Sequence, residues 1–397
     1  MINMKTTEII HQINTHLTTN PGLDQHTGLY GGMAGTLLYT GYHSYFTNVD
    51  SFFDDKTFDI LIDKIFESIN NPMQPFIFSS GLTGELWTLF NLQKLEYLDI
   101  DEQVFTFYKD ILNQSLIANA KADLWDNLHG AFGILYYLNY TNTLKKNTLS
   151  EFLSLYAEKV YSKKEFVFYA TKANILSEEL TYNLSLSHGL SGQVLIFSYL
   201  LKKHPDNKQL RNLLNDMVQF ILGYRCQSDT MSIFPSTLSD LKDIPHPEPC
   251  RLAWCYGDLG TGFALYRYSS QIKDERLFNM SIKILETAAK RRGTQENRVI
   301  DAPLCHGASG IMQTFHRLHF ETNNSIFKDA TDYWFEETIK FYERSNSLEM
   351  MGAWRHDSKS FLPVAGLLEG YAGISLVLLS KEHPEIEPKW DGCLFLS

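Results

Sequence analysis

Two adjacent side chains, Cys305 and His306, are the strongest candidates for chemistry in this chain of 397 residues. They stand directly before a Gly-x-x-Gly step that begins at Gly307. A second cysteine, Cys255, holds the place equivalent to Cys305 before the step at Gly257. Thiolates are soft ligands that favour zinc over magnesium or calcium. Two thiolates, one imidazole and an open fourth position are typical of catalytic zinc.

The Gly-x-x-Gly step occurs seven times, and each copy opens an apolar run. The first glycines are Gly32, Gly81, Gly130, Gly189, Gly257, Gly307 and Gly370. One such step is weak evidence, but seven at similar spacing indicate a repeat architecture. If the repeats close into a ring, side chains in equivalent positions meet near its axis at one end.

The apolar runs predict helices that are buried on most faces, because they contain few polar residues. They cover residues 36–39, 85–92, 134–140, 193–201, 263–268, 311–320 and 374–379. Glycine at the start of each run lets the backbone approach a neighbour closely and leaves free N–H groups at the helix N-terminus.

Longer amphipathic segments separate these runs and predict a second set of helices. They lie near residues 5–17, 54–70, 101–118, 150–162, 206–223, 274–290 and 325–343. Seven helix pairs predict an all-α fold, with an inner barrel of apolar helices inside an outer barrel of amphipathic ones. Because the repeats span most of the chain, we expect residues 1–397 to form a single domain, with long irregular loops near 225–250 and 344–366.

The charge, the apolar stretches and the cysteine content argue against a nucleic-acid-binding, membrane-spanning or disulfide-rich protein. The net charge is −11 without a basic cluster, which argues against a nucleic-acid partner. No signal core and no membrane-spanning apolar stretch is visible, so we expect a cytoplasmic protein without a transmembrane segment. Five cysteines are an odd number and too few for a disulfide framework. Cys226, Cys250 and Cys393 lie outside the repeat register and are interpreted as core residues.

His188 is the best candidate for acid or base work, because it stands one residue before its first glycine and histidine titrates near neutral pH. Asp126 precedes the next glycine upstream by about one helical turn and could orient His188. His129 and Glu369 hold the same register position as His188, so either could line the site. A surface salt bridge explains Asp126 equally well from the pattern alone.

Arg251 and Tyr256 flank Cys255 and could bind a developing negative charge. For Arg251, too, a surface salt bridge is an equally good explanation from the pattern.

Three motifs set among the repeats resemble those of the LanC family of lanthionine synthetase cyclases. They are Trp254-Cys255-Tyr256-Gly257, Cys305-His306-Gly307 and Ser187-His188-Gly189. The resemblance covers essentially the whole chain, and the length is similar to that of stand-alone cyclases. It implies an α/α toroid, a Zn²⁺ ion held by Cys255, Cys305 and His306, and active-site roles for His188, Asp126, Arg251 and Tyr256.

The activity that the resemblance implies is thioether formation. A substrate cysteine thiolate adds to dehydroalanine or dehydrobutyrine in a dehydrated lantibiotic precursor peptide, which gives lanthionine or methyllanthionine. The resemblance also implies a leader on that peptide and an assembly with a dehydratase and an exporter, through which the protein associates with the membrane.

Three other functions stay open at this point. A zinc-dependent thiol-binding or glutathione-adding protein would keep the same ligands, as eukaryotic relatives of the family suggest. A prenyltransferase also activates a thiol with zinc, but its ligands are arranged differently. A helical scaffold would carry no zinc. Residues 182–187 and His129 depart from the usual family pattern, which bears on substrate preference and leaves the reaction unchanged.

Overall fold

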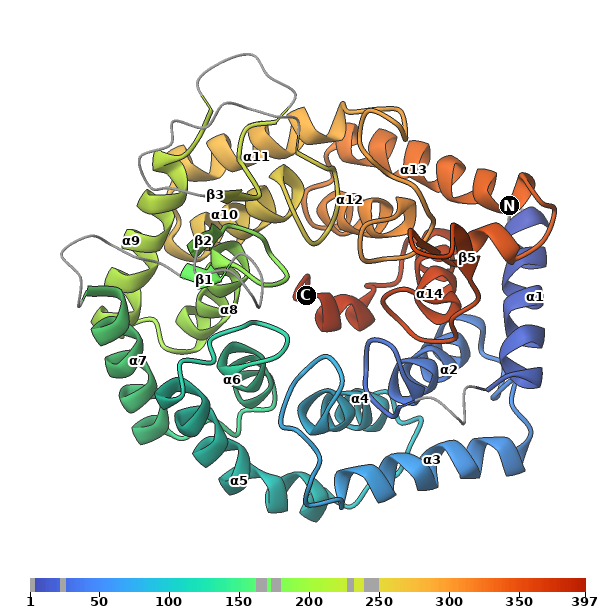
Figure 1. Cartoon of the computed structure of the whole chain (residues 1–397), viewed down its shortest axis with the longest axis horizontal. Helices are drawn as coiled ribbons and strands as arrows, with labels where there is room; N and C mark the ends of the chain where they lie inside the picture. The colour runs from blue at the N-terminus through green and yellow to red at the C-terminus, as the bar shows by residue number, and fades with distance from the viewer. Residues whose placement is uncertain (1–3, 22–25, 162–169, 173–179, 227–231, 239–249) are drawn as a thin grey trace. The chain divides into compact units, whose positions relative to one another are not determined.

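The computed structural model describes residues 4–21, 26–161, 170–172, 180–226, 232–238 and 250–397. Contacts along the backbone divide the chain into two compact units. Unit 1 joins Met1–Phe107 with Thr294–Ser397, and unit 2 is Tyr108–Gly293. Each unit is built from the predicted alternation of apolar and amphipathic helices (Figure 1).

All seven apolar helices begin at the residue after a first glycine, three to five residues before the predicted apolar runs, so the Gly-x-x-Gly step is itself the first turn of each helix. In unit 1 they are α2 (Met33–Thr47), α4 (Leu82–Lys94), α12 (Ala308–Thr322) and α14 (Tyr371–Glu382). In unit 2 they are α6 (Ala131–Tyr140), α8 (Leu190–Lys203) and α10 (Asp258–Ile272). Helix α2 runs past the predicted end at residue 39, because Tyr42 and Phe46 continue its buried face.

The amphipathic helices also lie where their spacing predicts. Unit 1 contains α1 (Met4–Thr19), α3 (Asp55–Ile69) and α13 (Ser325–Glu343), and unit 2 contains α7 (Lys146–Tyr161), α9 (Lys208–Gly223) and α11 (Glu275–Ala289). Helix α5 (Glu102–Lys121) begins in the first segment of unit 1 and continues into unit 2. In α3 the residues Leu61, Ile65 and Ile69 are buried at helical spacing, and Asp54 caps the helix by accepting a hydrogen bond from the Thr57 N–H at 2.9 Å.

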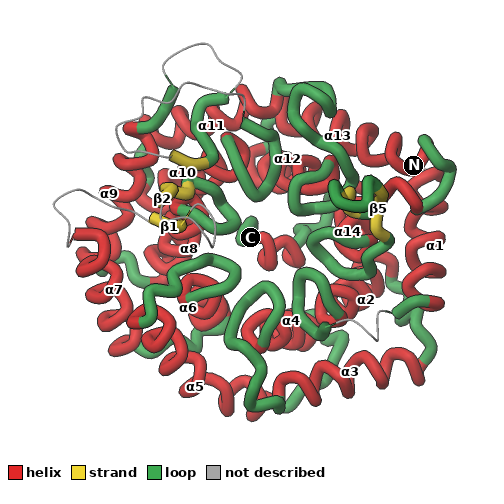
Figure 2. Tube along the Cα trace, viewed as in Figure 1, coloured by secondary structure: helices red, strands yellow, loops and turns green. Residues whose placement is uncertain are grey.

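Apolar helices pack on apolar helices within each unit. In unit 1, α2 lies between α4 and α14, and α12 contacts both α14 and α13. In unit 2, α8 lies between α6 and α10, and α10 packs against α11. The loops before the apolar helices of a unit lie together at one end of that unit (Figure 2). We call these loops, each ending at a first glycine, the glycine loops.

The glycine loops satisfy the helix N-termini that the sequence leaves without a side-chain cap. In α4 the Leu82 N–H donates to the Pro75 carbonyl at 2.9 Å, and in α6 the Ala131 N–H donates to the Leu124 carbonyl at 2.8 Å. Each acceptor stands six residues before the first glycine. In these helices the first N–H group, which the sequence leaves without a side-chain cap, is bonded to the loop, so it is not left unpaired.

At several steps the second glycine permits close packing between neighbouring repeats. A Cβ atom on Gly84 of α4 would lie 2.9 Å from the Leu29 side chain, and one on Gly260 of α10 would lie 2.8 Å from the Leu186 side chain. Real Cβ atoms essentially never approach that closely. The glycine therefore sets how near the next repeat can come.

Two small antiparallel sheets were not predicted, because their strands are only two to four residues long. β1 (Ala170–Lys172), β2 (Leu180–Asn183) and β3 (Thr237–Leu238) form one sheet in that order. β4 (Ala353–Arg355) and β5 (Ser360–Leu362) form a hairpin inside the segment predicted as an irregular loop near 344–366, after the short helix η1 (Glu349–Met351). Most of the loop predicted near 225–250 lies outside the described residues, at 227–231 and 239–249.

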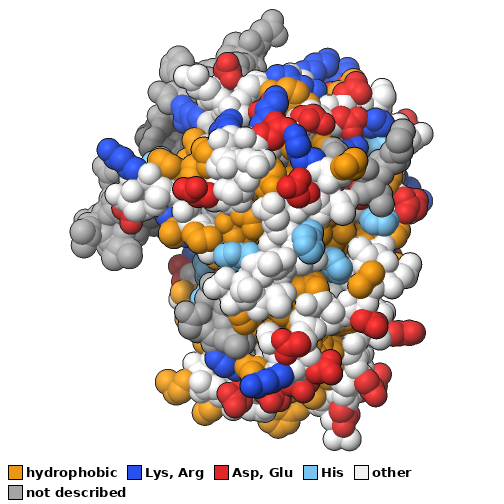
Figure 3. Space-filling model, turned by 90° about the vertical axis from the view of Figure 1, so that its right-hand side faces the viewer, with side chains coloured by type: hydrophobic (Ala, Val, Ile, Leu, Met, Phe, Trp, Pro, Cys, Tyr) orange, Lys and Arg blue, Asp and Glu red, His pale blue; other side chains and the backbone are white. Residues whose placement is uncertain are grey.

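The amphipathic helices present mixed charge to solvent. Figure 3 shows acidic and basic side chains interspersed over one face of the molecule. Of the helices in the described ranges, none combines the length and the apolar character needed to cross a bilayer.

The C-terminal helix η2 (Lys389–Leu394) is fastened to α12 by a buried ion pair. The Arg317 guanidinium donates to both carboxylate oxygens of Asp391, at 3.0 and 2.8 Å, and the two side chains are 1% and 0% exposed. Gln313 of α12 also donates to Asp391 at 2.9 Å. The chain end is thereby made part of the core of unit 1.

We expect Asp391→Ala to destabilise the protein by about 1–3 kcal/mol, because the buried Arg317 loses the acceptor of two of its hydrogen bonds. Arg317 keeps the carboxylates of Glu387 at 3.1 Å and Glu321 at 3.6 Å. The measurement is urea unfolding followed by circular dichroism. Asp329→Ala removes an exposed carboxylate from α13 and should change the free energy of unfolding by less than about 0.5 kcal/mol. Equal effects of the two variants would contradict this account of the ion pair.

Candidate functional site

Backbone hydrogen bonds join the glycine loops of unit 1 at the position two residues before each first glycine. The Cys305 N–H donates to the Leu368 carbonyl at 3.0 Å. The Leu368 N–H donates to Tyr30, and the Tyr30 N–H donates to Ser79, both at 2.8 Å. Four successive loops are thus held in one register by main-chain atoms, so Cys305 has a fixed place whatever its side chain binds.

A backbone hydrogen bond between glycine loops also occurs in unit 2, at Cys255. Its carbonyl accepts the N–H groups of Leu186 at 3.0 Å and Ser187 at 3.3 Å. Ser187 also stands two residues before its first glycine, so the two cysteines occupy equivalent positions in their repeats, as the spacing predicts.

The loop that carries Cys255 makes a sharp turn that requires glycine. Gly257 has a φ of +86°, and a Cβ atom there would lie 2.6 Å from the Arg251 carbonyl oxygen. The next residue, Asp258, is buried and accepts hydrogen bonds from the N–H groups of Ile233 and Phe234. Arg291 lies 3.5 Å from the same carboxylate. This buried network holds the loop on both sides of Cys255.

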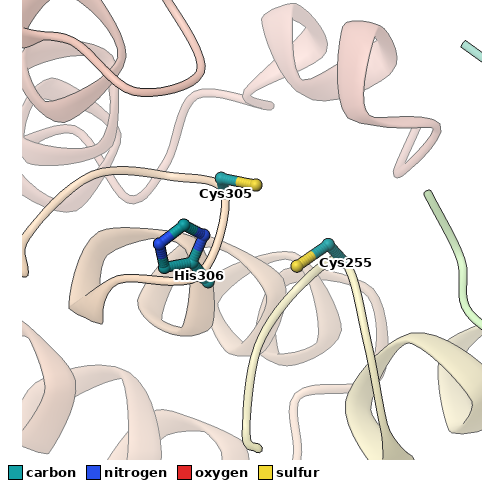
Figure 4. A group of neighbouring side chains, drawn as sticks. All are labelled: Cys255, Cys305 and His306. Atoms are coloured by element: carbon teal, nitrogen blue, oxygen red, sulfur yellow. The ribbon is translucent and has the colours of Figure 1, made fainter. Parts of the chain in front are cut away.

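The donor atoms of Cys255, Cys305 and His306 all lie within 4.8 Å of one another. Figure 4 shows the three side chains converging, Cys255 from the loop before α10 and the other two from the loop before α12. Cys255 is 4% exposed, Cys305 and His306 are half-buried, and both cysteines are free thiols. Two sulfurs and one imidazole in this arrangement can hold a zinc ion and leave a position open.

A buried carboxylate stands behind His306. The Asp301 Oδ2 atom lies 3.6 Å from the His306 Nε2 atom, and Asp301 is 1% exposed. The same oxygen accepts a hydrogen bond from the Trp354 N–H of β4 at 3.1 Å. A carboxylate on the far nitrogen of a metal-ligating histidine fixes the orientation and tautomer of the ring. Sequence reasoning missed Asp301; its only signal is an acidic residue five positions before His306.

Asp126 and His188 form a hydrogen-bonded pair, as the sequence suggested. The distance between Asp126 Oδ2 and His188 Nδ1 is 2.9 Å. The other carboxylate oxygen accepts the N–H groups of Leu128 and His129, each at 2.8 Å. Burial alone would raise the pKa of the Asp126 carboxyl, but the hydrogen bond and charge of His188 and the two backbone donors lower it overall. Asp126 is therefore a carboxylate at neutral pH, and its partner is His188.

The two residues that flank Asp126 in the sequence, Trp125 and Asn127, hold the loop that positions the Asp126–His188 pair. Trp125 is buried and meets the rings of Phe152 and Tyr156 of α7 edge-on, at 5.5 and 5.3 Å. Asn127 donates to the carbonyls of Leu186 at 3.1 Å and Gly189 at 2.9 Å, which ties its loop to the loop that carries His188.

Asn127 was not predicted, although the sequence holds a signal for it. It stands three residues before its first glycine, where the other six repeats carry Leu, Phe or Trp. A polar residue at an otherwise apolar register position marks a hydrogen bond that the fold needs.

The remaining candidates take different places. The His129 ring stacks on that of His188 with centroids 5.4 Å apart, and burial lowers its pKa. Glu369, which shares its register position, instead pairs with Arg355 of β4 at 2.8 Å. Arg251 and Tyr256 are half-buried on the loop that carries Cys255.

The family model of lanthionine synthetase C-like proteins matches residues 24–395. The chain belongs to that family. The structure of this LanC-like chain is similar to that of nisin cyclase, with a TM-score of 0.74 over 98% of this chain and 96% of that chain. The two sequences are 18% identical, so the likeness concerns the fold. It confirms the predicted α/α toroid.

Two further comparisons add nothing about function. A glycosyl hydrolase of family 88 from Bacteroides vulgatus aligns with 96% of this LanC-like chain and 98% of its own length at 10% identity, but its TM-score is only 0.39. No curated protein matches the chain in sequence.

Asp301→Asn should weaken the binding of zinc by about 10–100-fold, because the ring of His306 loses the carboxylate that orients it. The measurement is competition for zinc with a chromophoric chelator. Asp59→Asn, on the exposed face of α3, removes one negative charge from unit 1 as a control. A zinc affinity that Asp301→Asn leaves unchanged would show that the carboxylate does not act on His306.

Proposed function

We propose that this LanC-like protein is a peptide cyclase that forms lanthionine and methyllanthionine rings. Its substrate is a precursor peptide that contains cysteine together with dehydroalanine or dehydrobutyrine. The observation that carries the proposal is the convergence of Cys255, Cys305 and His306 to within 4.8 Å in a chain of this family. The similar structure is that of a protein named nisin cyclase, which agrees with a peptide substrate.

Zinc suits the donor set. Both cysteines are free, the histidine has a carboxylate behind it, and no fourth protein donor belongs to the group among the described residues. Cys255, Cys305 and His306 would hold the ion. When bound, zinc supplies a Lewis acid that deprotonates a coordinated thiol, whereas a free cysteine is only about 3% ionised at pH 7.

His188 is assigned as the acid that completes the addition. The thiolate sulfur forms a bond to the β-carbon, and the electron pair of the double bond moves toward the carbonyl as an enolate. The α-carbon then takes a proton, which replaces the proton lost by the thiol, so the reaction needs no oxidant or reductant. Asp126 holds His188 Nδ1 at 2.9 Å, which leaves Nε2 as the nitrogen that can serve the substrate.

Arg251 and Tyr256 are assigned to the enolate oxygen. Both lie on the loop that carries Cys255 and are half-buried. Donors aimed at the oxygen where charge develops stabilise the transition state more than the ground state.

Zinc content tests the ligand assignment. The purified protein should carry about one tightly bound zinc per chain, and Cys305→Ala should lose it, because two ligands do not retain the ion. The measurement is elemental analysis after gel filtration. Cys226→Ala removes a cysteine outside the repeat register and should keep the metal. Stoichiometric zinc in Cys305→Ala would refute the ligand set.

Cyclisation tests the role of His188. With a dehydrated peptide, His188→Ala should cyclise about 10²–10⁴-fold more slowly, the usual worth of a positioned acid or base, while its tightly bound zinc stays unchanged. The rate is read as loss of free thiol in the peptide. His11→Ala, on the exposed face of α1, serves as control.

Two results would count against the assignments. Loss of zinc in His188→Ala would make His188 a fourth ligand and close the open position. Consumption of added glutathione without ring formation would favour the glutathione-adding function that the family also suggests.

A further inference from the structure

A second group of metal-capable side chains lies in unit 2 and contains no cysteine. Asp126, His129 and His188 each offer one donor atom, and the three atoms lie within 4.8 Å of one another. The proposed reaction uses Asp126 and His188 but gives His129 no task. With His129, the hydrogen-bonded pair of Asp126 and His188 becomes a group of three possible metal ligands.

The carboxylate of this group is already oriented toward the two rings. One oxygen of Asp126 is held by the N–H groups of Leu128 and His129 at 2.8 Å, and the other faces His188 at 2.9 Å. Because the backbone fixes Asp126, no side-chain rearrangement is needed to present it.

The two imidazoles lie one above the other. Their centroids are 5.4 Å apart and their planes differ by 19°. Donor atoms that share one ion at bonds of 2.0–2.2 Å stand about 3–3.5 Å apart. Asp126 Oδ2 and His188 Nδ1 lie 2.9 Å apart, slightly closer than this, and would separate a little around an ion. The donor atom of His129 lies within 4.8 Å of the other two, so a turn of its ring would complete the set.

One carboxylate and two imidazoles form a recognised ligand set for divalent transition-metal ions. The set differs from Cys255, Cys305 and His306 in lacking a soft thiolate. It is also more exposed, and its ligands must give up a hydrogen bond and protons on binding. Both differences make it the weaker of the two sites.

We propose that Asp126, His129 and His188 form a second divalent-metal site, and that an ion bound there stops His188 from donating its proton. The site itself follows from the geometry of unit 2. Only its inhibitory effect rests on the proposed cyclase function. Free zinc above the amount needed for the first site would then inhibit the protein.

Titration of the metal-depleted full chain with Co²⁺ separates the two sites. The first equivalent should produce sulfur-to-cobalt charge-transfer absorption, because it binds two thiolates. The second should add only weak visible bands, because its ligands are oxygen and nitrogen. Cys305→Ala should lose the charge-transfer absorption and keep the second equivalent.

His129→Ala and His129→Gln decide the assignment. Each should keep the charge-transfer absorption of the first equivalent and weaken the second by about tenfold or more, since even an outer-sphere partner is worth that much. His11→Ala should bind both equivalents like the wild type. A second equivalent that binds the two His129 variants with unchanged affinity, or that also shows charge-transfer absorption, would overturn the site.

Inhibition is measured on the same variants with a dehydrated peptide. The ratio of the rate at excess zinc to the rate with one zinc per chain should fall well below one for the wild type and approach one for His129→Ala. A ratio equally low in both proteins would refute the inhibitory role. A wild type that cyclises no peptide at either zinc level would refute the proposed function, while the Co²⁺ titration would still decide whether the second site exists.

Discussion

Close approach of the backbone at the Gly-x-x-Gly step is the constraint on which the rest of the structure depends. The second glycine lets the next repeat pack where a Cβ atom would collide, as at Gly84 and Gly260. The loops are then near enough for main-chain hydrogen bonds at the level of Cys305 and Cys255. Because backbone atoms set this register, the side chains at and after these positions are free to serve chemistry.

In each unit, buried polar residues fix the side-chain orientations that this register allows. Asp301 faces the far nitrogen of His306, Asn127 joins the loops of Asp126 and His188, and Asp258 holds the loop of Cys255. Each of them is bonded to backbone N–H or carbonyl groups of another segment. A buried polar group is costly unless it is bonded, so these contacts specify one arrangement of the loops.

Much of this could be predicted from the sequence, and the remainder has a common physical reason. Apolar spacing located both helix sets, and the glycine register brought Cys255, Cys305 and His306 into one group. The roles of Asn127, Asp301 and the Arg317–Asp391 pair were not predicted. Each depends on a contact with a residue 5 to 74 positions away, and the periodicity of a sequence does not show which distant residues are in contact. The short strands were missed because two to four residues carry no measurable alternation.

The C-terminal ion pair has a consequence for how the protein is made. Unit 2 is continuous from Tyr108 to Gly293, so it can fold while the ribosome is still adding later residues. Unit 1 is built from Met1–Phe107 and Thr294–Ser397, and Asp391 of the second segment closes its core on Arg317. Cys305 and His306 belong to this late unit. The loop that carries Cys305 and His306 can therefore take its place only after the segment that follows unit 2 has been synthesised.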